Sequence, residues 1–140
     1  MPRRVSAARA ATPLVYDAGA LVAADRGERQ MWAQFAVAAA ERRPIIVPSP
    51  VLAQVWRGGR TQARLARMLA GCRVVAPGEA VAKLAGELLG RSGTNDAIDA
   101  MVVATAVLLR AAIVTSDVED ISRLAESADS DVEVAILRPS

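Results

Sequence analysis

Short apolar runs alternate along this chain with longer segments whose apolar residues recur at helical spacing. The short runs are bounded by turn residues and predict strands, whereas the longer segments predict helices. Regular alternation of this kind is typical of an α/β fold. We expect strands at 14–16, 45–47, 72–75, 113–115 and 132–137, the last one being an edge strand.

The segments between these strands predict the helices. A first helix is expected to begin near Ala18, and others to cover 29–41, 50–56, 61–69, 78–89, 96–110 and the residues after Asp117. Thr61 is expected to cap one of them and Gly90 to end another. The most apolar run, 100–109, is far shorter than the roughly 20 residues that cross a bilayer. We therefore expect a buried helix there and no membrane partner.

The length of 140 residues predicts one domain. We expect a flexible tail at 1–13, rich in Ala and Arg and without the apolar stretch of a signal peptide, followed by a single domain at 14–140. The single Cys72 excludes an internal disulfide and is expected to be a small buried hydrophobe. A cytoplasmic location is compatible with this cysteine content.

The composition excludes several kinds of chemistry. The chain has no histidine, so Ser-His-Asp and Cys-His nucleophiles and mixed His/Cys zinc sites are ruled out. Its only lysine, Lys83, lies in a predicted helix and not in a phosphate-binding loop. Aromatic residues make up only 3% of the chain, so Trp32 and Trp56 are interpreted as packing or dimer anchors and not as base-stacking surfaces. Carboxylates, hydroxyls, amides and arginines remain.

Three kinds of position bring aspartates toward one place. Asp17 directly follows the strand at 14–16, and Asp117 lies just beyond the strand at 113–115. In open parallel sheets, ligands bind outside the carboxyl ends of the strands. Asp96 and Asp99 share one face in the first turn of the apolar helix. Convergence of these acids would require bound cations, and Mg²⁺ or Mn²⁺ suits such oxygen ligands.

Each of these acids also has a structural interpretation. Asp17 and Asp117 are suitable helix caps, and Asp96 is suitable for stabilising a helix dipole. Asp99 is different because it lies in a helix that is apolar nearly all round, where an unpaired charge is costly. A functional role is therefore favoured most strongly for Asp99.

These segments resemble the PIN-domain family, and within it the VapC-like toxins of toxin–antitoxin pairs. The resemblance lies in 15–21 (VYDAGAL), 94–104 (TNDAIDAMVVA) and 114–117 (VTSD), in that order. It implies a PIN-like three-layer α/β/α fold with a central, mainly parallel five-stranded sheet. It also implies a Mg²⁺- or Mn²⁺-dependent endoribonuclease that forms a homodimer and is silenced by a small cognate antitoxin.

The chain departs from the family pattern at one position. The family usually has a Glu on the helix after the second strand, where this chain has Gln54, which lacks the charge that helps to hold a dication. We expect Asp17, Asp99 and Asp117 to hold the metal, Asp96 to serve as a fourth carboxylate, and Gln54, Thr115 and Ser116 to support them. The alternative is a catalytically weak or inactive PIN-fold module that binds a partner protein or RNA.

Basic residues gather in the middle of the sequence, at Arg42, Arg43, Arg57, Arg60, Arg64, Arg67 and Arg73. Arg60, Arg64 and Arg67 recur at the spacing of one helix face, with Arg57 just before them. Such a stripe is suited to RNA phosphates or to the acids of an antitoxin, and it also suits a solvated helix face.

Overall fold

A computed structural model of the chain describes residues 12–136 and contains one five-stranded sheet. The strand order is β3-β2-β1-β4-β5, and every neighbouring pair is parallel. Val15 lies opposite Ile46 on one side and Ile113 on the other. The expected α/β fold is confirmed. The strands are β1 (Leu14–Tyr16), β2 (Ile45–Pro48), β3 (Arg73–Val75), β4 (Ala112–Thr115) and β5 (Val134–Ile136).

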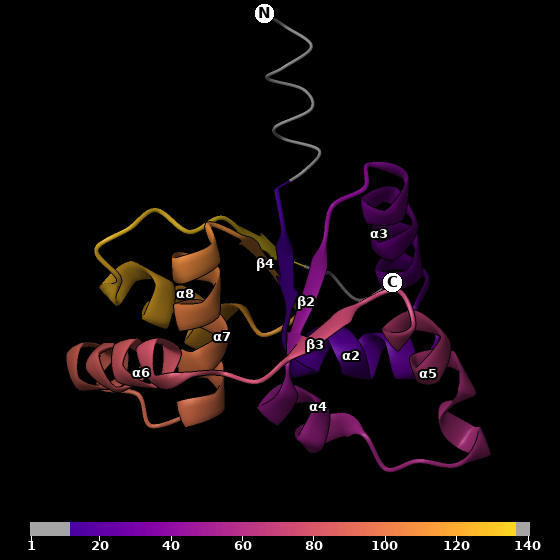
Figure 1. The fold of residues 1–140 in the computed structure, drawn as a ribbon, viewed down its shortest axis with the longest axis horizontal. Coiled ribbons are helices and arrows are strands. Elements are labelled where there is room, and N and C mark those ends of the chain that lie inside the picture. The colour runs from indigo at the N-terminus through magenta and orange to yellow at the C-terminus, as the bar shows by residue number, and fades with distance from the viewer. Residues whose placement is uncertain (1–11, 137–140) are drawn as a thin grey trace, which may run out of the picture.

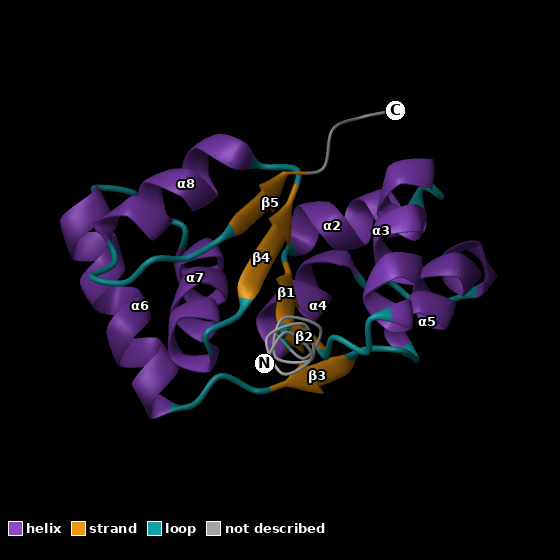
Figure 2. Ribbon diagram, turned by 90° about the horizontal axis from the view of Figure 1, so that it is seen from above, coloured by secondary structure: helices purple, strands orange, loops and turns teal. Residues whose placement is uncertain are grey.

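Helices cover both faces of the sheet, as the three-layer expectation requires (Figure 2). Helices α6, α7 and α8 lie on one side, and α2, α3, α4 and α5 lie on the other. The bounds are α2 (Ala18–Asp25), α3 (Arg29–Ala40), α4 (Ser49–Val55), the 3₁₀ helix η1 (Arg60–Gln62), α5 (Ala63–Leu69), α6 (Glu79–Ser92), α7 (Ala97–Leu109) and α8 (Val118–Ser127).

The central strands and α7 form the core. All residues of β1, β2 and β4 are buried, because strands covered on both faces have no solvated side. Helix α7 packs against β1, β2, β4, α6 and α8, which explains why it is apolar nearly all round. Within residues 12–136, no helix combines the length and the hydropathy that a membrane span needs.

The two tryptophans have different surroundings. The Trp32 indole N–H donates to the Ala24 carbonyl at 3.1 Å, and its ring meets Phe35 edge to face with centroids 5.8 Å apart. Trp32 is therefore a packing residue, as expected. Trp56 follows the last residue of α4 and is 40% exposed. Cys72 is half-buried, and burial raises the pKa of its thiol to about 12, as expected for an inert side chain.

Two predicted helix boundaries were wrong. Thr61 does not cap a helix: it lies inside η1, and the side chain of Gln62 turns inward to bond the preceding loop. Gly90 lies inside α6, which continues to Ser92 and ends at Gly93. Gly93 has a φ of 73°, the left-handed conformation that ends helices and that glycine adopts without strain. The tail residues 1–11 and the expected strand end at Leu137 lie outside the described residues.

Candidate metal centre

The candidate site lies where the strand order reverses. The chain proceeds from β1 to β2 and β3 on one side and then returns to place β4 on the other side of β1. Asp17 follows β1 and Asp117 follows β4, so the parallel register brings both acids to the same edge of the sheet. Ligand sites of open α/β sheets occur at such switch points.

Asp17 is buried and fully supported by the protein. One carboxylate oxygen accepts from the Ala20 amide at 2.9 Å, which caps α2, and the other accepts from the Thr115 hydroxyl. Burial raises the pKa of Asp17 above its ordinary value, although these two hydrogen bonds act in the opposite direction. Asp17 is thus both a helix cap and an acid of the site.

Thr115 also fixes the segment that carries Asp117. Its hydroxyl accepts from the Asp117 amide at 2.8 Å, so one hydroxyl connects the two acids that follow β1 and β4. The hydroxyl of Ser116 lies against Gly19, where a Cβ atom would collide with it. Thr115 therefore positions Asp17, and Ser116 packs beside it.

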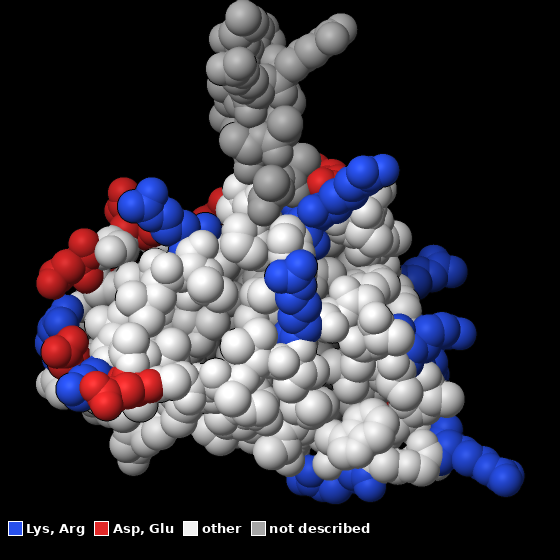
Figure 3. Space-filling model, in the orientation of Figure 1, with Lys and Arg blue, Asp and Glu red and all other residues white. Residues whose placement is uncertain are grey.

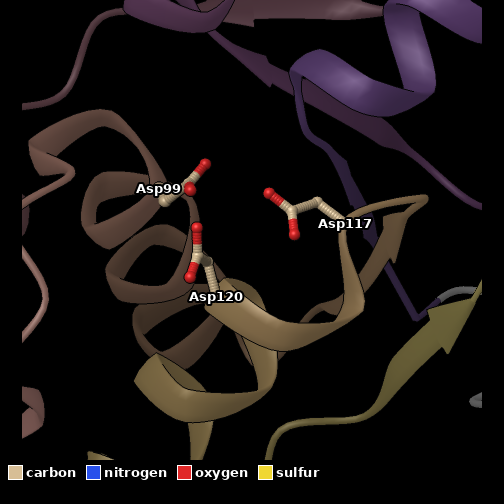
Figure 4. Close-up of side chains that lie close together, drawn as sticks. All are labelled: Asp99, Asp117 and Asp120. Atoms are coloured by element: carbon tan, nitrogen blue, oxygen red, sulfur yellow. The ribbon is translucent and has the colours of Figure 1, made fainter.

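Three carboxylates converge next to this pair, namely Asp99 from α7, Asp117 before α8 and Asp120 in α8 (Figure 4). One oxygen from each lies within 4.8 Å of the others, and Asp99 and Asp120 are half-buried. Hard oxygen ligands in such a group fit Mg²⁺ or Mn²⁺. The residues present therefore fit the divalent cation that the sequence predicts.

Asp99 is the acid with the least support. Burial is the largest cause that raises its pKa to about 7, followed by the charges of Asp96, Asp117, Asp17 and Asp120. Within residues 12–136, its amide donates to Asp96, but no hydrogen bond to its carboxylate is found. A cation is the natural partner for a carboxylate in this position.

Asp120 is a site residue that the sequence analysis missed. It lies three residues after Asp117, in a helix that begins directly after Asp117. The same spacing drew attention to Asp96 and Asp99, so the signal was present. It was hidden because Asp120 falls within the acidic C-terminal part of the chain, where charge is expected on a solvated surface.

Asp96 lies outside the group of three. Its carboxylate caps α7 by accepting from the amides of Ile98 and Asp99, both at 3.0 Å. It influences the site at a distance by raising the pKa of Asp99. Capping, which was its structural interpretation, is the contact that the structure shows.

Gln54 is exposed on α4. Helix α4 packs against α2 and α7, the helices that begin next to Asp17 and Asp99. Gln54 thus occupies the correct helix for a supporting role, but no hydrogen bond connects it with the acids within the described part of the chain. Its role remains a prediction.

The predicted arginine stripe does not lie on one helix. Arg60 belongs to η1, whereas Arg64 and Arg67 belong to α5, because the inward turn of Gln62 interrupts the helix between them. All four arginines of this segment are exposed. Figure 3 shows basic side chains toward the side of α3 and α5 and acidic ones mainly toward that of α6 and α8.

A parallel α/β domain with aspartates at its switch point defines a class of candidate metal-dependent hydrolases. The family model named PIN domain matches residues 14–127, so the chain belongs to the PIN domain family. No curated relative matches the chain.

Several solved structures share the fold. A chain of the VapBC2 complex from Rickettsia felis, bound to a DNA fragment from its promoter, is 16% identical over 91% of this chain and 100% of that chain, with a TM-score of 0.73. A toxin–antitoxin complex from Klebsiella pneumoniae is 19% identical over 78% and 90%, with a TM-score of 0.63. FitAB bound to a DNA fragment is 14% identical over 86% and 92%, with a TM-score of 0.62.

Proposed function

We propose that the protein is a Mg²⁺- or Mn²⁺-dependent endoribonuclease and the toxin of a VapBC-like toxin–antitoxin pair. The observation that carries this proposal is the convergence of Asp99, Asp117 and Asp120 beside the buried Asp17, at the switch point of a PIN domain. Because the chain has no histidine, hydrolysis at this site would depend on carboxylates.

Asp99, Asp117 and Asp120 would hold the cation, and Asp17 would face it from the end of β1. When bound, the ion supplies an activated water and neutralises charge on the phosphate. Thr115 keeps the Asp17 carboxylate in one orientation by donating to it. Helix α2 contributes its Ala20 amide, which holds the second oxygen of the same carboxylate. The protein thus presents a rigid set of oxygens that needs little rearrangement on binding.

Arginines beyond α4 would bind the RNA backbone. Arg57, Arg60, Arg64 and Arg67 are exposed, and contacts of this kind neutralise phosphates without reading sequence. The same side chains suit the acids of a partner protein, as noted from the sequence.

The proposed partners are an antitoxin and a second copy of the chain, and the proposed location is the cytoplasm. The structural neighbours support an antitoxin, since they include VapBC2, FitAB and a toxin–antitoxin complex. The alternative function, a weak or inactive binding module, is supported by one observation: Gln54 supplies no charge where the family usually has Glu.

The test is cleavage of labelled total RNA by the purified protein with Mg²⁺ or Mn²⁺. We expect cleavage that EDTA abolishes and that Asp99→Asn lowers by more than about 100-fold, beyond the typical cost of losing an outer-shell group. Asp131→Asn is the matched control, because Asp131 is an exposed acid outside the group of three. Intact RNA in every lane, with no calorimetric binding of either metal, would support the binding module instead.

A further inference from the structure

The loop after α4, residues 56–59, is held in one conformation by a buried side chain. The Gln62 carboxamide oxygen accepts from the amides of Arg57 at 2.7 Å and Gly58 at 2.9 Å, and its nitrogen donates to the Val55 carbonyl at 2.9 Å. These bonds use groups that the end of a helix leaves unpaired. The loop, here named the Trp56 loop, is therefore preorganised.

Helix α2 connects this loop to the candidate metal centre. Asp17 caps the first turn of α2, and Asp25, its last residue, contacts the Gln62 nitrogen at 3.5 Å. Eight residues of helix rise about 12 Å. At about 3.4 Å per nucleotide of a stacked strand, that length corresponds to a few nucleotides. One strand can therefore contact both places.

The Trp56 ring is left open by its neighbours. Its side chain is followed by Gly58 and Gly59, which have φ values of 82° and 88° and carry no side chain that could cover it. A Cβ atom on Gly58 would lie 3.8 Å from the indole nitrogen, and one on Gly59 would meet open space. With 40% of its surface exposed, Trp56 presents aromatic surface to solvent.

The charges around this ring favour a polyanion. The Arg57 guanidinium is held by the carbonyls of Ala53 at 3.2 Å and Trp56 at 2.8 Å, so a cation is fixed beside the ring. Residues 42–78 contain no Asp or Glu. The same stretch contains Arg42, Arg43, Arg57, Arg60, Arg64, Arg67 and Arg73. An aromatic surface within a basic segment is the arrangement that binds single-stranded nucleic acid.

We propose that Trp56 stacks on an unpaired base of the RNA substrate and that Arg57 contacts an adjacent phosphate, so that the substrate is single-stranded. This inference rests on the proposed nuclease function and specifies its substrate class. It replaces the sequence-based interpretation of Trp56 as a packing or dimer anchor. Stacking accepts every base, so Trp56 selects for strandedness and not for sequence.

The test uses the small number of tryptophans. Trp32 and Trp56 are the two in the chain, so Trp32→Phe makes Trp56 the single reporter. In an Asp99→Asn background, which is expected not to cleave, we expect a single-stranded oligoribonucleotide of mixed sequence to quench Trp56 fluorescence. A duplex of the same sequence should not quench it. An abasic strand of equal length should bind without quenching, because it has phosphates and no bases.

Affinity variants give an independent measurement in the Trp32-containing protein. We expect Trp56→Ala to weaken binding of the single strand about tenfold by fluorescence anisotropy, and Trp56→Phe to keep most of the affinity. Val37→Ala is the matched control, because Val37 is another exposed apolar residue, on α3. Thermal melts show that each variant is folded before its affinity is compared.

The contradicting outcomes separate the two proposals. Strand binding without quenching, or an unchanged affinity in Trp56→Ala, would overturn the role of Trp56 and leave the nuclease in place. If Trp56→Ala instead lowers association with a second copy or a partner protein while RNA affinity stays the same, Trp56 is a protein-binding residue. An absence of both RNA binding and metal-dependent cleavage would overturn the nuclease as well.

Discussion

The candidate site has an acidic side and a basic side that are built differently. The acidic side, formed by Asp99, Asp117 and Asp120, is compact and half-buried, and its carboxylates face one another. The basic side, formed by Arg57, Arg60, Arg64 and Arg67, is spread over two helices and a loop. Most of its arginines are engaged singly: Arg57 and Arg64 bond carbonyls, and Arg67 lies 5.3 Å from the centre of the Trp32 ring.

This difference indicates where function is concentrated. Mutual repulsion on the acidic side is relieved by one ion that binds several acids together, so the loss of one acid affects all of them. Exposed arginines on the basic side contribute separately and are screened by salt. We therefore expect steep effects from single changes on the acidic side and shallow effects on the basic side.

The largest of these effects is expected for Asp120, and Asp96 provides the contrast. Asp120→Asn removes a carboxylate from the group of three and should weaken Mn²⁺ binding by calorimetry about tenfold or more. Asp96→Asn should leave Mn²⁺ affinity and RNA cleavage nearly unchanged, because Asn caps helices as well as Asp does. Equal losses in the two variants would contradict the assignment of Asp96 to capping.

The next effect is a pH dependence of stability. The folded-state pKa of Asp99 is about 7, above its ordinary value of 3.8, so its protonated form favours the folded protein. That contribution is complete below about pH 4 and is lost as the pH rises toward 7. We expect the melting temperature in EDTA to fall over this range.

Two comparisons sharpen this measurement. Asp99→Asn should make the fall smaller, since the amide does not ionise, and Mg²⁺ should also reduce it because the ion favours the ionised carboxylate. Asp17, whose pKa is also raised, acts in the same direction, so some decline should persist in the variant. A decline that is identical in the two proteins would show that Asp99 does not titrate in this range.

A smaller effect is expected on the basic side. Arg60→Ala and Arg64→Ala should each weaken RNA binding a few-fold and reduce the slope of log affinity against log salt by about 0.7, the value for one phosphate contact of a single strand. Lys83→Ala is the control, because Lys83 lies on α6 and pairs with Glu79. Slopes that do not differ from that of the control would assign these arginines to a solvated surface.

The smallest expected effect is a gain. Gln54→Glu restores the charge that the family usually has, on a helix that packs against α2 and α7. We expect Mn²⁺ affinity and cleavage to rise a few-fold, because an added carboxylate strengthens the binding of a dication. Unchanged calorimetric affinity would show that residue 54 lies too far from the ion to matter.

Local sequence determined the order of strands and helices and three of the site residues. Apolar runs, turn residues and helical spacing act over a few positions, so they are readable without the fold. Asp17 and Asp117 were identified because each follows a strand, and Asp99 because it is a charge within an apolar helix. Helix ends were less readable, as Thr61 and Gly90 show, since the inward turn of Gln62 and the left-handed Gly93 decide them.

Only the tertiary structure decided which side chains share a site. Asp120 joins Asp99 and Asp117 because α8 lies against α7, whereas Asp96, adjacent in sequence, is occupied with the amides of its own helix. Trp32 and Trp56 have the same chemistry, yet one is packed against Phe35 and the other lies open beside two glycines. The reason is physical: convergence and exposure depend on how distant elements pack, and no local pattern contains that information.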